Sequence, residues 1–150
     1  MPNPLWWITK DGDDACRQLH ERHYSKYKYA DGRKPKLFVG PGQKIVLRTW
    51  DGGAFFVWRK FIDKAIPLQN GINCAAFRNE GEIRSSELIR QADAIADLLW
   101  VGERHYTYVN PKEVRSRNPG YCFIKAGWNK CGFTKGGLLI LEKHNLDTDF

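Results

Sequence analysis

Two β-prone runs joined by a tight turn constrain the fold of this chain more than any other segment. Residues 44–50 (KIVLRTW) and 54–59 (AFFVWR) are rich in aromatic and β-branched residues, and Asp51-Gly52-Gly53 separates them. Aspartate and glycine readily adopt the backbone conformations that a hairpin turn requires. The sequence therefore predicts an antiparallel hairpin, and a hairpin of such apolar strands must belong to a larger sheet.

Helical spacing identifies one long helix after this hairpin. Apolar residues recur three and four positions apart from Leu88 to Leu99, and Ser85-Ser86 precedes them as the expected N-cap. Shorter helices are predicted from the Asp11-Gly12-Asp13-Asp14 turn to about residue 23 and over residues 121–126. Further strands are predicted over residues 5–9, 73–78, 104–109 and 137–142. This order predicts an α/β or α+β fold with a mixed sheet.

The length of the chain and its cysteines bound the class of protein. One domain spanning residues 1–150 is expected, because 150 residues suffice for a single core. No run of about 18 apolar residues and no export signal is found, so we expect a soluble cytoplasmic protein with no membrane association. The four cysteines form no Cys-x-x-Cys pair and are expected to be reduced thiols.

The charge favours polyanionic partners. Twenty-four Lys and Arg against 17 Asp and Glu give a net charge of +7. Basic residues concentrate in residues 17–36 and 104–135, which favours nucleic acid or a phosphorylated cofactor such as coenzyme A. The alternative interpretation is a solvated basic surface that serves solubility.

The element order and several motifs resemble the GNAT superfamily of N-acetyltransferases. Residues 73–78 match the family's central strand, residues 79–84 its phosphate-binding turn, and the helix from Ser85 follows as in the family. Residues 121–128 (YCFIKAGW) are similar to its Tyr-x-x-x-Gly-Phe ending, with Phe123 at the tyrosine position. His23-Tyr24-Ser25 and Asn118-Pro119-Gly120 are more similar to an outlying branch, the bacteriophage Mom-type DNA-modification proteins.

This resemblance implies a mostly antiparallel mixed sheet flanked by helices, and it implies a donor site. Acetyl-CoA or a related acyl-CoA is expected at the turn and helix start, where unpaired N–H groups favour anions. The donor-binding candidates are Asn79, Gly81, Arg84, Ser85 and Ser86. Plain helix capping is the alternative for the serines.

Three residues are candidates for catalysis and four for substrate binding. Tyr121 is the candidate general acid, Glu80 the candidate general base, and Asn110 lies at the end of a predicted strand. The substrate-binding candidates are His23, Tyr24, Arg115 and Arg117. His20 and His23 share a helix face, but no third ligand lies near them in sequence and no metal site is predicted.

The sequence thus leads to one hypothesis and two alternatives. The hypothesis is a GNAT-like transferase that moves an acyl group from acyl-CoA to an amine, with a nucleobase in DNA as one candidate acceptor. The first alternative is a non-catalytic nucleic-acid-binding module with this fold. The second is an interaction protein of a phage or mobile element.

Overall fold

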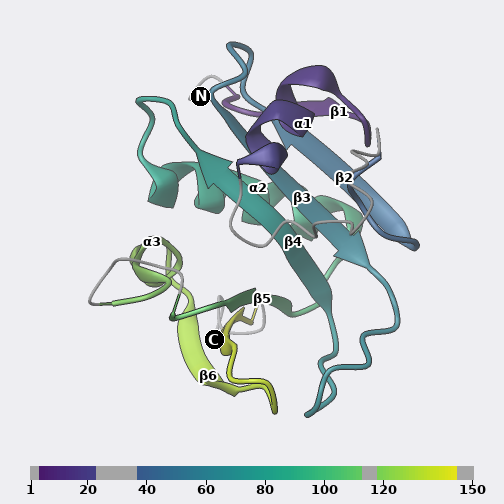
Figure 1. The fold of residues 1–150 in the computed structure, drawn as a ribbon, viewed down its shortest axis with the longest axis vertical. Helices are drawn as coiled ribbons and strands as arrows, with labels where there is room; N and C mark the ends of the chain where they lie inside the picture. The colour runs from purple at the N-terminus through teal and green to yellow at the C-terminus, as the bar shows by residue number, and fades with distance from the viewer. Residues whose placement is uncertain (1–3, 23–36, 113–117, 145–150) are drawn as a thin grey trace.

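Seven strands form one mixed sheet in the order β1-β2-β3-β4-β5-β7-β6 (Figure 1). The structure is a computed structural model, and it describes residues 4–22, 37–112 and 118–144. The strands are β1 (Trp7–Thr9), β2 (Gln43–Arg48), β3 (Ala54–Lys60), β4 (Ile72–Asn79), β5 (His105–Val109), β6 (Asn129–Phe133) and β7 (Leu139–Lys143). The helices in the described ranges are α1 (Asp14–Glu21), α2 (Ser85–Leu99) and α3 (Tyr121–Lys125). The fold is therefore α+β.

The predicted hairpin is confirmed, and one strand was missed. Strands β2 and β3 pair antiparallel from Gln43 opposite Lys60 to Arg48 opposite Phe55. The predicted long helix, the two predicted shorter helices and the other predicted strands are also present. Strand β6 was not predicted, because its sequence NKCGF is mostly exposed and has no apolar alternation. It is a strand because its backbone pairs with β7.

One of the two predicted helix N-caps is confirmed, and the other is wrong. Asp13 caps α1, and its carboxylate accepts a hydrogen bond from the Cys16 backbone N–H at 3.1 Å. Ser85 or Ser86 was predicted as the cap of α2, but both are helical residues and Arg84 occupies the cap position without a side-chain hydrogen bond. The Ser85 hydroxyl instead accepts a hydrogen bond from Asn79 Nδ2 at 3.0 Å.

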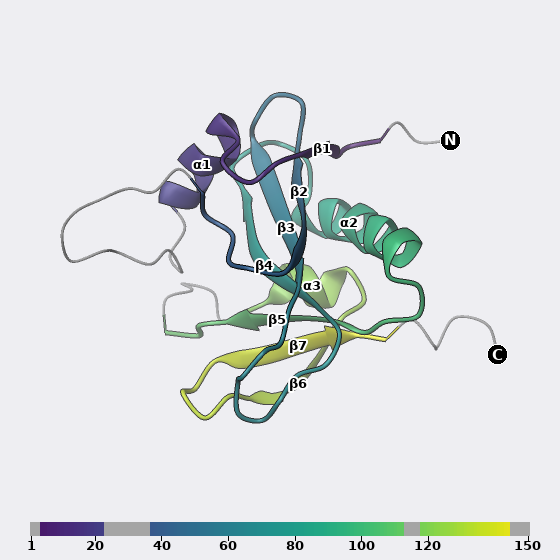
Figure 2. The same ribbon diagram turned by 90° about the vertical axis from the view of Figure 1, so that its right-hand side faces the viewer.

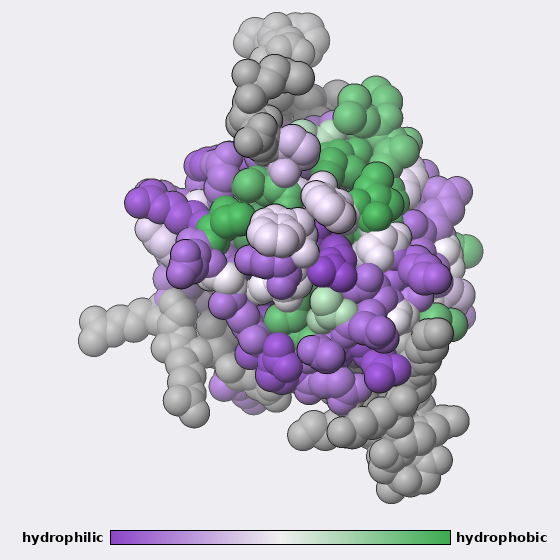
Figure 3. All heavy atoms as spheres, turned by 90° about the horizontal axis from the view of Figure 1, so that it is seen from above, coloured by the Kyte–Doolittle hydropathy of each residue, from purple (hydrophilic) through white to green (hydrophobic). Residues whose placement is uncertain are grey.

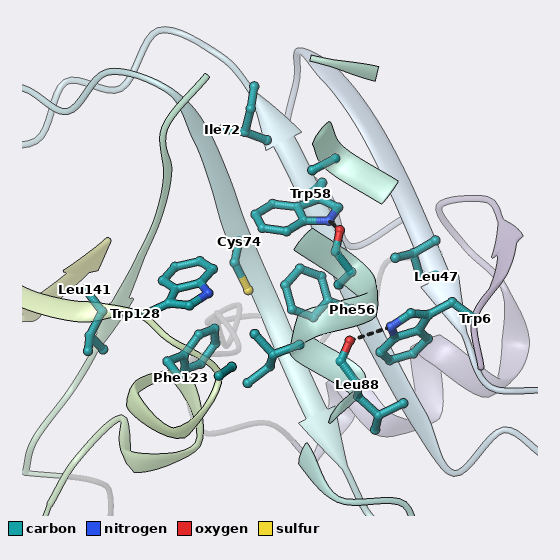
Figure 4. Close-up of a cluster of buried hydrophobic side chains, with 14 of the residues drawn as sticks. Trp6, Leu47, Phe56, Trp58, Ile72, Cys74, Leu88, Phe123, Trp128 and Leu141 are labelled. Carbon is teal, nitrogen blue, oxygen red and sulfur yellow. Dashed lines mark hydrogen bonds between the residues drawn. The ribbon is translucent and has the colours of Figure 1, made fainter. Parts of the chain in front are cut away.

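The sheet has α1 on one face and α2 on the other, as Figure 2 shows. The larger core fills the space between the sheet, α2 and α3, where Phe56, Trp58, Phe123 and Trp128 pack together (Figure 4). The indole N–H of Trp58 donates to the Ala92 carbonyl of α2 at 2.9 Å. A smaller core between the sheet and α1 contains Cys16, Leu19, Val46, Phe55 and Val57. Both faces of β3 are therefore buried, as its unbroken apolar run requires.

The surface mixes hydrophilic and hydrophobic regions. Figure 3 shows hydrophobic side chains gathered on one side of the upper surface, whereas most of the remaining surface in that view is hydrophilic. Exposed apolar side chains include Trp7 and Ile8 of β1 and Leu98 and Val101 around the end of α2. Within the described ranges, no helix is both long enough and apolar enough to cross a bilayer.

Candidate functional site

Strands β4 and β5 are the only parallel neighbours in the described sheet, and they separate after three residue pairs. Their pairing runs from Ile72 opposite His105 to Cys74 opposite Thr107, although β4 continues to Asn79 and β5 to Val109. In Figure 2, β5 and β7 lie at a large angle to β2 and β3. Beyond Cys74, no strand in the described part of the chain pairs with this edge of β4.

A bulge in β4 marks the point of separation. Opposite β3, Val57 pairs with Ala76 and Trp58 pairs with Cys74, which leaves Ala75 without a partner. An extra residue of this kind bends the strand and increases its twist. The bulge therefore turns β4 away from β5 at the place where their pairing ends.

A cavity of about 530 Å³ occupies the gap between the two strands. No charged side chain lines it in the described ranges. Its walls come from β4, from β5 and the residue after it, and from the region of α3 and β7. The lining residues are Asn73, Cys74, Ala75, Ala76, Phe77, Thr107, Tyr108, Val109, Asn110, Gly120, Cys122, Phe123 and Leu138. The cavity is thus suited to an uncharged group.

The polar lining side chains differ in how they are bonded. The Thr107 hydroxyl donates to the Cys74 carbonyl at 3.0 Å, and Asn110 Oδ1 accepts from the Lys112 backbone N–H at 3.0 Å. The Tyr108 hydroxyl donates to Asp63 Oδ2 at 2.7 Å. Asn73 Nδ2 is buried and finds no hydrogen-bond partner in the part of the chain that the structure describes.

Two thiols line the cavity, and both are unsuited to nucleophilic attack. Burial raises the pKa of Cys74 far above its ordinary value, and it also raises the pKa of Cys122. A thiol rather than a thiolate is therefore present at neutral pH. All four cysteines are free, as the sequence led us to expect, and Cys16 and Cys74 are buried.

Glu80, the predicted general base, is held by two arginines in the turn after β4. Its carboxylate pairs with the Arg22 guanidinium at 2.9 Å and also with Arg78. Hydrogen bonds from Arg22 and then Arg78 lower the pKa of Glu80 to about 2. This geometry does not favour Glu80 as a general base, because such a carboxylate is a weak base and Glu80 does not line the cavity.

Asn79 organises the turn that was predicted to bind phosphate. Its Nδ2 donates to the Ile83 carbonyl at 2.6 Å and to Ser85 Oγ, and its Oδ1 accepts from the Gly81 N–H at 2.9 Å. Gly81 lies against the hairpin turn: a methyl group on Gly53 would come within 3.2 Å of the Gly81 Cα atom. The turn is thus a compact segment between the end of β4 and the start of α2.

The predicted site residues other than Glu80 fall into four groups. Asn110 lines the cavity. The donor-binding candidates Asn79, Gly81, Arg84, Ser85 and Ser86 directly follow the cavity-lining part of β4 but do not line the cavity, and Arg84 is exposed. Tyr121 is 54% exposed and lies outside the lining, although its neighbours Gly120 and Cys122 belong to it. His23, Tyr24, Arg115 and Arg117 lie outside the described residues.

A buried histidine, His105, connects several elements at the closed end of the gap, which is the end where β4 and β5 are still paired. His105 Nδ1 lies 2.8 Å from Asp93 Oδ1, and its Nε2 lies 3.1 Å from Asp97 Oδ1. Asp93 also accepts from the Trp128 indole N–H at 2.9 Å and contacts Lys143 Nζ at 3.4 Å. Because these groups come from α2, β5, β7 and the residue before β6, the network fixes the strands where they are still paired.

Histidine and acidic residues form no metal centre in the described ranges. No group of three or more His, Cys, Asp or Glu side chains could hold a metal ion there. The ring of His20 stacks on Phe38 with 5.2 Å between centroids, so His20 has a packing role.

No protein-family model and no curated protein matches this chain. Its function is therefore inferred from the geometry of the cavity.

Sequence reasoning missed three residues of this site: Asp63, Asn73 and Tyr108. Asn73 and Tyr108 belong to predicted strands and therefore count as core positions in a sequence analysis. Asp63 lies 45 positions before Tyr108 along the chain. No local pattern connects the two residues, since only the tertiary fold brings the loop after β3 beside β5.

Proposed function

We propose that this chain is a GNAT-like acyltransferase that binds acyl-CoA at the gap between β4 and β5 and transfers the acyl group to an amine. The observation that carries the proposal is the separation of two parallel strands next to a bulge, with an uncharged cavity between them. The resemblance of the element order and of residues 121–128 to the GNAT superfamily supports the same function.

The edge of β4 beyond Cys74 supplies the groups that such a donor needs. Its backbone N–H groups have no strand partner in the described sheet, so they are available to a carbonyl oxygen. Fixed N–H donors stabilise the negative charge that develops on this oxygen during acyl transfer. Acyl-CoA, when bound, supplies a thioester that is activated toward attack by an amine.

The turn after β4 and the start of α2 would hold the phosphates of the donor. Helix α2 has 15 residues, and the free N–H groups of its first turn attract anions. Arg84 and Ser86 lie at this end. The carboxylate of Glu80 does not oppose an anion here, because Arg22 and Arg78 neutralise it.

Calorimetric titration with acetyl-CoA tests the proposal. The wild type should bind in the micromolar range. Ala75 is exposed and lines the cavity, so Ala75→Trp should fill the gap and weaken binding by about tenfold or more, which is about 1.4 kcal/mol. Ala94→Trp is the matched control, because Ala94 is exposed on α2 outside the cavity, and binding should be unchanged.

A second variant tests the phosphate end separately. Arg84→Glu with Ser86→Glu places two negative charges at the start of α2, so it should abolish binding of acetyl-CoA. The absence of wild-type binding, or equal binding by Ala75→Trp and Ala94→Trp, contradicts the proposal. Salt-sensitive binding of DNA without acetyl-CoA binding would favour the non-catalytic nucleic-acid-binding module instead.

A further inference from the structure

Asn73 and Tyr108 lie on the same face of the sheet, on the neighbouring strands β4 and β5 near the point where the two strands separate. Asn73 pairs with Tyr106 in the parallel register, so both side chains point to the same face. Tyr108 is two residues beyond Tyr106 and shares that face as well. Both Asn73 and Tyr108 line the cavity, whereas Tyr106 does not.

The Tyr108 hydroxyl uses its proton to donate a hydrogen bond to Asp63. Asp63 is buried, and its Oδ2 accepts hydrogen bonds from Tyr108 at 2.7 Å and from Tyr106 at 2.8 Å. Its Oδ1 accepts from the Ala65 backbone N–H at 3.0 Å. Burial and the bond to Asp63 raise the pKa of Tyr108, so the hydroxyl keeps its proton. Its oxygen therefore offers a ligand only lone pairs, which accept an N–H.

Asn73 offers the complementary group. Its Nδ2 is a donor that is buried without a partner within the described residues, and Asn73 is only 5% exposed. A buried donor without an acceptor destabilises the folded protein, and a ligand carbonyl oxygen would remove this cost. Asn73 is thus a lining residue with an unpaired donor that an acceptor atom of a ligand would satisfy.

We propose that Asn73 and Tyr108 form a subsite for an uncharged amide-type group. Asn73 Nδ2 donates to its carbonyl oxygen, and the Tyr108 hydroxyl oxygen accepts from its N–H. The absence of charged lining side chains among the described residues fits a neutral group. This subsite rests on the proposed function, because it requires the cavity to be the ligand site. The amide belongs either to the donor or to the acceptor substrate.

Titration of ¹⁵N-labelled protein with N-methylacetamide tests the subsite without any acyl-CoA. The side-chain NH₂ signals of Asn73, assigned by their loss in Asn73→Leu, should shift with concentration. Methyl acetate keeps the carbonyl group but lacks the N–H, so it should bind several-fold more weakly. Equal shifts with both probes, or no shift at Asn73, would overturn the subsite.

Two tyrosine variants separate the role of Tyr108 from its structural bond. Tyr108→Phe and Tyr106→Phe each remove one hydrogen bond to Asp63 Oδ2, but only Tyr108 lines the cavity. N-methylacetamide binding should weaken several-fold in Tyr108→Phe and stay unchanged in Tyr106→Phe. An equal effect in both folded variants would sink the proposal.

A final titration identifies the source of the amide and separates the two proposals. If saturating acetyl-CoA abolishes the shift by N-methylacetamide, the subsite holds an amide of the donor; if the shift persists, it holds the acceptor substrate. Tight acetyl-CoA binding with no response to N-methylacetamide overturns the subsite alone. A response to N-methylacetamide without acetyl-CoA binding overturns the acyl-CoA function and leaves the subsite.

Discussion

Glu80 stands in the turn where the proposed donor places its phosphates, and a free carboxylate there would repel them. Arg22 and Arg78 both pair with it, so the three side chains together carry one net positive charge. Arg78 also donates to the Arg22 carbonyl at 2.8 Å, which ties the end of α1 to β4. At the scale of the residue, the acid in this turn is therefore part of a basic cluster.

Replacing Glu80 should give a pH-dependent loss of stability. The pKa of Glu80 is lowered to about 2 in the folded state, below the value of about 4.3 for an unfolded chain. Its contribution to stability is complete above the unfolded pKa and is lost as the pH falls through about 2. The difference in unfolding free energy between wild type and Glu80→Gln should thus be smaller at pH 3 than at pH 7, by urea denaturation.

Glu82→Gln is the control for this experiment. Glu82 is exposed in the same turn, and no ion pair to it is found among the described residues. The pH-dependent difference should be absent in this variant. An equal difference for Glu80→Gln at both pH values would contradict a stabilising role for its ion pairs.

Helix α3 shows how one glycine positions an element of the site. Gly120 precedes α3 in a left-handed conformation with a φ of 78°. A Cβ atom at this position would lie 2.5 Å from Leu141 Cδ1 of β7. Because Gly120 has no side chain, the start of α3 can lie close to β7. Helix α3 in turn brings Cys122 and Phe123 to the cavity. Arg90 of α2 secures the other end of α3 by donating to the Lys125 carbonyl at 2.8 Å.

Gly120→Ala should therefore destabilise the protein more than the same change at another left-handed glycine. Gly102 has a φ of 76°, and a Cβ atom there would meet nothing within 4 Å. Gly102→Ala should cost only the backbone strain, about 1–2 kcal/mol. Gly120→Ala should cost about 1–3 kcal/mol more through the contact with Leu141. Thermal unfolding of both variants measures the difference. Equal losses of stability would contradict the close packing of residue 120 against Leu141.

Across the molecule as a whole, the gap between β4 and β5 requires that the two strands stay firmly connected where they are still paired. Strands β4 and β5 diverge beyond Cys74, so the two parts of the sheet are held together by three residue pairs between these strands and by α2. The carboxylate of Asp93 on α2 is central to this connection. It contacts His105, Trp128 and Lys143 in the later half of the chain.

Asp93→Ala should therefore be among the more damaging substitutions. The side chain of Asp93 is 2% exposed, and removing one member of a buried charged network costs about 3–5 kcal/mol. Asp97 lies one turn later, contacts the other His105 nitrogen and is 41% exposed, so Asp97→Ala should cost about 1 kcal/mol or less. Urea denaturation compares the two variants. Similar losses would show that the network does not hold the closed end.

Elements with strong local sequence signals could be predicted without the structure. The hairpin follows from Asp51-Gly52-Gly53 between two apolar runs, and α2 follows from its helical apolar spacing. Asn110, which the sequence places at a strand end, lines the cavity, and its catalytic role stays a prediction. These features can be predicted because turn chemistry and side-chain periodicity act over a few residues.

The other features of the site depend on contacts between distant parts of the chain. Strand β6 exists through its pairing with β7, and the cavity exists because β4 and β5 separate at the bulge. The bond between Asp63 and Tyr108 and the ion pairs of Glu80 join residues from distant parts of the chain. No local pattern encodes these contacts, since they depend on how strands far apart in sequence are placed beside one another.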